Sequence, residues 1–346
     1  MLNNLQILRA FAALNVVLFH IIIIGEAQGF GIPSLEFLSG WGANGVDIFF
    51  VLSGFLMVYI AELRPREPLA FLKNRAIRII PIYWILTAVG VLAVLLAGDF
   101  QGQPVTGELI AGSFLFFTRW ADIYQPIIYV GWTLEWEMLF YLIFGLCLIF
   151  KDRAVQFALP LVILTALVFL GGQNPIILEF GFGMIVAKLS KLEYIKANAG
   201  VIAMFGASLL LGNIWIKPDL PQAIIWGLPS ALLVLGLANA PQWKFRLGKH
   251  LGDASYSIYL IQVFTIPAFY KAAERIVPDM STLGLAMGCL IGTAIVGSLF
   301  HLAVEKPMQT LLTRKKAATA PYNIKRFRGG GGKTRLHPEG RPPNTR

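Results

Sequence analysis

The stretch LQILRAFAALNVVLFHIIII at residues 5–24 is apolar over most of its length. An α-helix needs about 20 predominantly apolar residues to cross the hydrocarbon core of a bilayer. No small-residue cleavage site follows the stretch, and Arg9 and His20 lie inside it. The stretch therefore predicts a first transmembrane helix rather than a removed signal peptide.

Similar apolar stretches recur along the chain. Of the 346 residues, 56% are hydrophobic and 14% are charged, whereas an ordinary soluble domain has about 25% charged residues. The segment 109–117 is too short to cross a bilayer, so we expect it to be re-entrant or interfacial. The candidate membrane spans lie near residues 6–24, 43–61, 77–97, 132–150, 155–171, 174–189, 199–216, 222–239, 252–271 and 282–304. The predicted fold is an all-α, polytopic bundle of about ten transmembrane helices.

The positive charges predict the orientation of this bundle. Thirteen Lys and Arg residues lie in or beside the connections after the second, fourth, sixth and eighth spans, and four lie in the alternate connections. Because positive loops stay in the cytoplasm, both termini are predicted to be cytoplasmic. Residues 314–346 contain ten Lys or Arg and one acidic residue. We expect a transmembrane domain over residues 1–313, followed by a disordered basic tail near anionic lipid rather than nucleic acid.

Metal and disulfide chemistry are not expected. The two cysteines, Cys147 and Cys289, lie inside apolar runs without metal-ligand spacing, and such residues are typically buried thiols. No metal or permanently bound cofactor is predicted, and the sequence gives no oligomeric state.

Ionisable residues inside the predicted spans indicate a site. A charged side chain at the bilayer centre costs about 2.5–3.5 kcal/mol on insertion scales, so it needs a partner or a function. His20, Asp47, Glu135 and Glu137 are expected near the outer ends of three spans, at similar depth. A neutral imidazole can take a proton from an attacking hydroxyl group, and a carboxylate can orient it. The alternative is that these side chains only hold helices together.

Basic residues on the cytoplasmic side form a second candidate site. Arg9 lies eleven residues before His20, which places the two on one helix face about 16 Å apart in depth. Arg9, Lys73, Arg75 and Arg78 converge where the first and third spans begin, and such a cluster suits a phosphate-bearing ligand. The alternative is the ordinary excess of positive charge on this side.

Six segments in this order resemble the motifs of the membrane acyltransferase-3 family, whose members O-acylate sugars. The resemblance spans residues 5 to about 310. The six segments are LQILRAFAALNVVLFH (5–20), GVDIFFVLSGFLM (45–57), FLKNRAIRIIPIYW (71–84), GWTLEWEMLFY (131–141), LGDASYSIYLIQ (251–262) and HLAVEKP (301–307).

The resemblance maps family roles onto particular residues. The fourth motif, with Thr133 and with Met138 after Glu137, is nearest to the exopolysaccharide O-acetyltransferase branch, while Gln262 stands where many members have His. The resemblance implies catalytic roles for His20, Asp47, Glu135 and Glu137. Implied donor-binding residues are Arg9, Arg75, Arg78 and Tyr83. Further motif positions are Ser53, Trp132, Thr133, Tyr141 and Tyr256.

The resemblance implies a reaction as well. The expected enzyme is an O-acetyltransferase of the cell inner membrane that uses acetyl-CoA as its donor substrate. Its expected acceptor is a hydroxyl group of an extracellular or lipid-linked glycan, of exopolysaccharide or lipopolysaccharide type. A proton-coupled transporter or flippase of a glycolipid is the alternative, because it would also place histidine and carboxylates in the bundle. Glu179, Glu305, Tyr259 and Gln262 are expected to make structural contacts.

Overall fold

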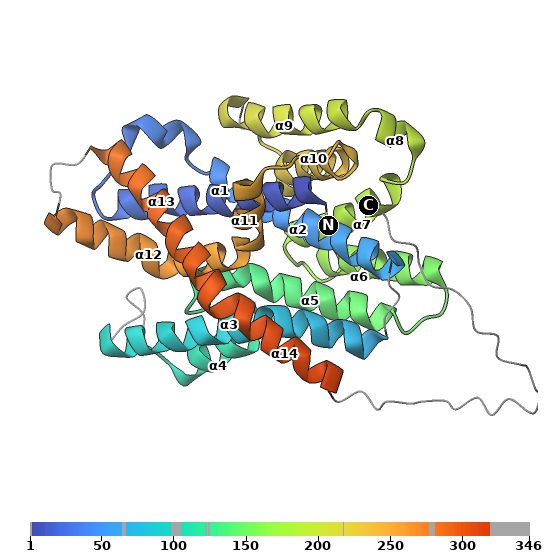
Figure 1. Cartoon of the computed structure of the whole chain (residues 1–346), viewed down its shortest axis with the longest axis horizontal. Helices are drawn as coiled ribbons and strands as arrows, with labels where there is room; N and C mark the ends of the chain where they lie inside the picture. Colours follow the sequence, from blue (N-terminus) through green and yellow to red (C-terminus); the bar gives the residue numbers. More distant parts are fainter. Residues whose placement is uncertain are drawn as a thin grey trace, which may run out of the picture.

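The computed structural model describes residues 2–63, 67–97, 105–121, 123, 125–216, 218–276 and 281–318. Within these ranges every regular element is helical and there is no strand, which confirms the all-α prediction (Figure 1). The predicted boundary between domain and tail falls within the last helix, which continues to Ala318. The rest of the predicted tail lies outside the described residues.

The α-helices of the described chain include one over each predicted span and four further helices between or after the spans. They are α1 (Asn3–Ala27), α2 (Asn44–Leu63), α3 (Pro68–Ala97), α4 (Gly107–Leu115), α5 (Trp132–Cys147), α6 (Arg153–Phe169), α7 (Leu178–Leu189), α8 (Glu193–Ala197), α9 (Ala199–Ile216), α10 (Leu228–Asn239), α11 (Arg246–Asp253), α12 (Ser255–Ile276), α13 (Thr282–Phe300) and α14 (Lys306–Ala318). The shorter turns are η1 (Pro33–Leu38), η2 (Trp41–Ala43), η3 (Arg119–Ala121), η4 (Tyr129–Gly131) and η5 (Pro175–Ile177). Two π-helical segments, η6 (Ala223–Gly227) and η7 (His301–Glu305), precede α10 and α14.

Six helical stretches of the described chain are long and apolar enough to cross a membrane. They are Asn3–Ala27, Trp41–Leu63, Pro68–Leu96, Tyr129–Cys147, Ala199–Ile216 and Thr282–Thr313. Two shorter apolar helices, Arg153–Phe169 and Ala223–Asn239, coincide with two more predicted spans. The chain is therefore a multi-pass membrane bundle, and the total of ten spans stays a prediction, as does the orientation of the termini.

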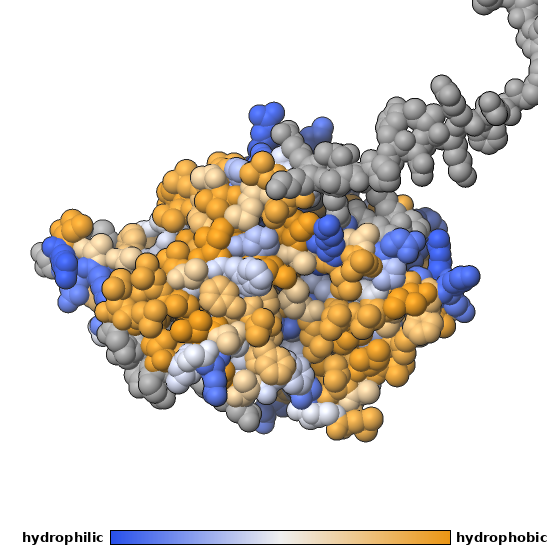
Figure 2. All heavy atoms as spheres, turned by 90° about the horizontal axis from the view of Figure 1, so that it is seen from below, coloured by the Kyte–Doolittle hydropathy of each residue, from blue (hydrophilic) through white to orange (hydrophobic). Residues whose placement is uncertain are grey.

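The outer surface fits a lipid environment. Large apolar side chains are exposed along the long helices, including Leu92 on α3 and Val201 and Trp215 on α9. Figure 2 shows broad hydrophobic areas on one face of the molecule. A soluble monomer seldom exposes such extended apolar surface, whereas lipid-facing helices must.

The centre of the bundle is built around α1 and α2. Helix α1 packs against α2, α10, α11, α12 and α13, and α2 packs along α7 (Figure 1). A Cβ atom on Gly54 of α2 would meet the carbonyl oxygen of Phe180 on α7, and one on Gly183 would meet that of Val51. Glycine at both positions lets the two backbones touch, as small residues do between membrane helices. This close approach sets the position of the polar residues on α2.

Candidate active site

A cavity of about 60 Å³ lies between α1, α2, α3, α5 and α12; we call it the core cavity. Residues from five of the six sequence motifs meet in it. The predicted site residues that line it are Arg9, Ser53, Arg75, Arg78, Thr133, Glu137, Tyr141 and Tyr256. Positions far apart in the sequence therefore line one common space.

Glu137 of α5 is the carboxylate of the core cavity. Its Oε1 accepts a hydrogen bond of 2.7 Å from Ser53 Oγ on α2 and one of 2.5 Å from Tyr141 OH, one turn further along α5. Hydrogen bonds to a charged acceptor are stronger than neutral ones. These contacts fix the carboxylate between two helices.

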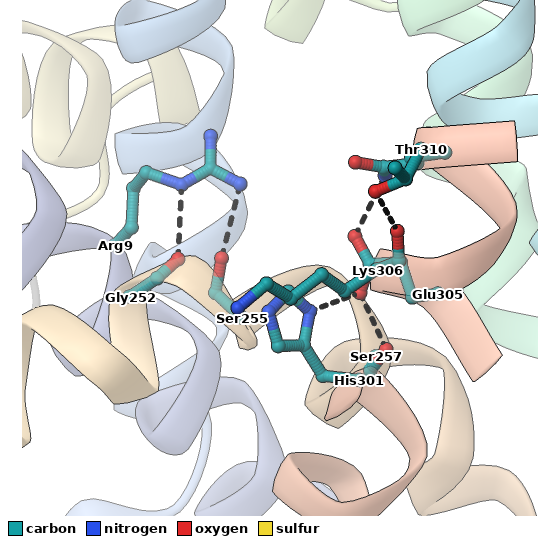
Figure 3. A network of polar contacts seen from close by, with 9 residues as sticks. Arg9, Gly252, Ser255, Ser257, His301, Glu305, Lys306 and Thr310 are labelled. Atoms are coloured by element: carbon teal, nitrogen blue, oxygen red, sulfur yellow. Dashed lines mark hydrogen bonds and ion pairs between the residues drawn. The ribbon is translucent and has the colours of Figure 1, made fainter. Parts of the chain in front are cut away.

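Three guanidinium groups, those of Arg9, Arg75 and Arg78, line the core cavity together with this carboxylate. Arg9 donates to Ser255 Oγ (3.0 Å) and to the carbonyl oxygen of Gly252 (3.5 Å), as Figure 3 shows. Arg75 lies against the rings of Phe71 and Tyr141. Among the described residues its buried Nε has no hydrogen-bond partner. Because an unsatisfied buried donor costs about 1–3 kcal/mol, an anionic ligand would improve this arrangement.

A second cavity of about 530 Å³ adjoins the core cavity; we call it the polar cavity. Arg78 lines both cavities, and Gly252, whose carbonyl group binds Arg9, also lines the second. Arg9 and Arg78 therefore lie at the junction of the two spaces. The polar side chains of the second cavity include Asn74, His250, Asp253, His301, Glu305, Lys306 and Gln309.

A buried hydrogen-bond network forms one wall of the polar cavity (Figure 3). Glu305 Oε2 lies 2.8 Å from His301 Nδ1 and accepts a 2.6 Å hydrogen bond from Ser257 Oγ. Gln309 donates to the other oxygen of Glu305 at 3.0 Å. The sequence predicted a structural contact at Glu305 and no role for His301. Their spacing of four residues within the last motif was the available signal, since such residues share a helix face.

His20 lies outside the core cavity but is connected to its wall. Its Nδ1 is 2.9 Å from the carbonyl oxygen of Val16 and 3.1 Å from Oε1 of Gln262. Gln262 in turn donates to the backbone oxygen of Tyr259 at 2.7 Å. The Tyr259 hydroxyl group lies 2.8 Å from Thr133 Oγ1, and both residues line the core cavity.

The expected cluster of one imidazole and three carboxylates does not form. Asp47 accepts a 3.1 Å hydrogen bond from Gln222 and is buried beside Glu179 of α7. Glu135 accepts hydrogen bonds from the backbone and hydroxyl groups of Thr118 and from the backbone of Arg119. Of the four residues, only Glu137 lines the core cavity. Depth in the membrane was estimated from sequence, but the direction of each side chain around its helix depends on packing.

Two further motif residues also lie away from the core cavity. Tyr83, expected to bind the donor, is fully buried against Phe116 and Gly131. Trp132 begins α5 and is partly buried at the hydrophobic core. In contrast, Tyr256 lines the core cavity, and its hydroxyl group donates to the carbonyl oxygen of Ile79 at 2.8 Å. Tyr83 and Trp132 therefore pack away from the core cavity, whereas Tyr256 lines it.

Comparison with known proteins identifies the bundle. A family model described as an acyltransferase domain matches residues 2–301. The chain belongs to the membrane acyltransferase-3 family. The chain is thus a membrane O-acyltransferase, and the resemblance noted from the motifs is confirmed.

Several curated members of the acyltransferase-3 family are similar to the chain. The exopolysaccharide production protein ExoZ of Rhizobium meliloti is 35% identical over 77% of this chain and 89% of its own length. The acyltransferase MdmB of Streptomyces mycarofaciens is 26% identical over 92% of this chain and 95% of its own length. The O-acetyltransferase OatA of Staphylococcus aureus is 27% identical over 75% of this chain and 49% of its own length. No solved structure matches the chain.

The described part of this acyltransferase-3 chain contains no group of three or more His, Cys, Asp or Glu residues that could hold a metal ion. Its cysteines are free thiols, and both are buried.

Proposed function

We propose that the protein transfers an acetyl group from acetyl-CoA to a hydroxyl group of an extracellular or lipid-linked glycan, of exopolysaccharide or lipopolysaccharide type. The observation that carries the proposal is the pair of adjoining cavities that share Arg78. The polar cavity is large and polar enough for a charged group, and the core cavity is small and lies between helices. This arrangement suits a donor with a highly charged end and a short acyl end.

The donor is proposed to reach the bundle from the cytoplasmic side. In the proposed orientation, the polar cavity faces the cytoplasm. Arg78 and Lys306, which line it, would bind donor phosphate groups, because guanidinium and ammonium groups both pair well with phosphate. The thioester end would extend past Arg9 into the core cavity, toward the buried and unpartnered Nε of Arg75.

The acceptor is proposed to approach from the opposite side of the membrane, next to His20. The acceptor oxygen forms a bond to the thioester carbonyl carbon, and the bond between that carbon and sulfur breaks. The hydroxyl proton moves to His20 and then to the CoA thiolate, so the step is balanced. Thr133 and Tyr259 line the core cavity, and Gln262 links Tyr259 to His20, so we propose that the acyl group meets the acceptor beside these residues.

The relatives support the acceptor class and the acyl group. The relative at 35% identity is an exopolysaccharide production protein, and a second relative is an O-acetyltransferase. Family membership also favours the enzyme over the transporter alternative. We therefore place the activity in the cell inner membrane, where cytoplasmic acetyl-CoA and an external glycan are both within reach.

The test is transfer of radiolabelled acetyl groups from acetyl-CoA to the extracellular glycan fraction of the host. Membranes would carry the wild-type chain, His20→Ala, or His337→Ala as a matched control in the predicted basic tail. Label in the wild type and the control but not in His20→Ala supports the proposal. Equal label in all three removes His20 from the reaction, and label in none counts against acetyl-CoA as donor.

A further inference from the structure

The two oxygen neighbours of His20 Nδ1 define the state of its ring. One is the carbonyl oxygen of Val16 at 2.9 Å, and the other is Oε1 of Gln262 at 3.1 Å. A carbonyl oxygen only accepts hydrogen bonds. The contact with Val16 lies within α1, whereas the contact with Gln262 joins α1 to α12.

The orientation of the Gln262 amide is fixed by its other contact. Its Nε2 lies 2.7 Å from the backbone oxygen of Tyr259, and the side chain is completely buried. Turning the amide over would place two oxygen atoms at that distance with no proton between them. It would also direct an N–H group at His20 Nδ1, whose other neighbour accepts only. Oxygen and nitrogen of an amide are assigned from such networks, and here only one assignment satisfies both ends.

Because both neighbours accept, Nδ1 must carry a hydrogen atom. A neutral imidazole has one N–H group, so its other nitrogen, Nε2, holds the free electron pair. We infer that Gln262 is a positioning residue for acyl transfer, which holds His20 as the Nδ1–H tautomer and turns its Nε2 toward the reacting groups. The inference rests on the proposed function of His20.

A neutral amide suits this position between membrane helices. Within the described residues, the His20 ring contacts Phe19, Tyr129, the Val16 carbonyl group and Gln262. Of these, only Tyr129 has a titratable side chain, and its ring centroid lies 5.0 Å from that of the imidazole. The hydrogen bond to Gln262 therefore orients the ring without placing a second ionised group in the bilayer, where one would be costly. Gln262 stands where many family members have histidine, and the geometry gives that difference a function.

The experiment measures the tautomer of His20 and the turnover of the enzyme separately. The full chain, labelled with ¹⁵N-histidine, is placed in lipid nanodiscs, and the His20 signals are identified by their loss in His20→Ala. Solid-state NMR then reports which ring nitrogen carries hydrogen. We compare the wild type with Gln262→Leu, which removes the acceptor, and Gln262→Glu, which keeps it. Asn213→Leu is the matched control, because its amide bridges α9 and η6 through a 2.6 Å hydrogen bond to the carbonyl oxygen of Ile225.

The wild type should show Nδ1–H and an unprotonated Nε2. In Gln262→Leu the Val16 carbonyl oxygen still accepts from Nδ1, so the Nε2–H tautomer should appear only as a partial population, and the ring should lose its tie to α12. This should lower kcat roughly 10- to 100-fold, the range for hydrogen bonds that orient metal-binding histidines, with an unchanged KM for acetyl-CoA. Gln262→Glu should restore the Nδ1–H tautomer and part of the turnover. Asn213→Leu should keep both the tautomer and kcat.

Two results would overturn the inference: an Nε2–H tautomer in the wild type, or a Gln262→Leu variant with wild-type tautomer and kcat. Thermal unfolding of each variant shows whether it is folded, and the Gln262→Glu result tests the role if Gln262→Leu is not. A tautomer as inferred, in a wild-type protein that transfers no acetyl group, would instead count against the proposed function, because the NMR measurement needs no substrate.

Discussion

Ser53 Oγ donates a 2.7 Å hydrogen bond to Glu137 Oε1, which links α2 to α5 at the wall of the core cavity. Tyr141 donates to the same oxygen. The carboxylate thus has a fixed position next to the cavity's three guanidinium groups. Its contacts distinguish it from Glu135, two residues earlier on the same helix.

We predict that Glu137→Gln lowers turnover strongly and leaves the fold intact. A hydrogen bond to a charged group contributes about 1.5–3 kcal/mol, so weakening the pair from Ser53 and Tyr141 should reduce kcat roughly 10- to 100-fold. Ser53→Ala and Tyr141→Phe should each show a smaller loss. The measurement is the initial rate at saturating acetyl-CoA, together with the melting temperature in detergent. Wild-type kcat in Glu137→Gln would contradict a role in the site.

Glu135→Gln should lower stability and leave turnover nearly unchanged, in contrast to Glu137→Gln. Glu135 binds two backbone amides and one hydroxyl group of residues 118–119 and is buried outside the core cavity. Removing its charge weakens these hydrogen bonds, so we expect a loss of about 1–3 kcal/mol in stability and near-normal kcat at low temperature. Melting temperature and initial rate measured on the same preparation check both parts. A large fall in kcat with an unchanged melting temperature would restore the catalytic role suggested by the family resemblance.

Arg78→Gln should weaken donor binding. Arg78 lines both cavities, and its guanidinium group is proposed to pair with a donor phosphate group. Loss of such a pair should raise the KM for acetyl-CoA about tenfold or more, and Arg78→Lys should not fully restore it because lysine lacks the bidentate geometry. Rates over a range of acetyl-CoA concentrations measure the effect. Lys196→Gln is the control for net charge, since Lys196 pairs with the exposed Glu193; an equal KM change there would make the effect nonspecific.

Gly54→Ala should destabilise the contact between α2 and α7. Its added methyl group would meet the Phe180 carbonyl oxygen, and overpacking of this kind costs about 1–3 kcal/mol. Gly200→Ala on α9 is the matched control, because a Cβ atom there meets nothing within 4 Å, and alanine favours a helix by about 0.5–1 kcal/mol. The fraction that stays monodisperse after heating in detergent compares the two. Equal heat resistance would show that the α2–α7 contact can relax.

The sequence predicted the helices well because hydropathy reports directly on bilayer crossing. It also selected Arg9, Arg75, Arg78 and Glu137, which meet in the core cavity. It misplaced Asp47 in the predicted cluster, since the hydropathy of a span gives depth but not rotation. Which face of α2 turns toward α7 depends on glycine contacts such as those of Gly54, and these involve residues more than a hundred positions apart.

The polar network at Glu305 could not be predicted from the sequence, for a related reason. Its partners come from α12, η7 and α14, and no single helix pattern shows such a meeting point. The short π-helical segment at His301–Glu305 has no clear signature in composition, although such segments often occur at functional sites. Tertiary packing determines both the meeting of these elements at Glu305 and the π-helical segment.

The positive charges of Arg9 and Arg78, at the junction of the two cavities, also bear on the proton gradient across the membrane. Fixed positive charges in a narrow passage repel protons and metal cations. In the proposed transfer of acetyl groups across the membrane, these two guanidinium groups would oppose a leak of protons along the same route. The same arginines that would attract an anionic donor would therefore hinder the passage of cations through the bundle.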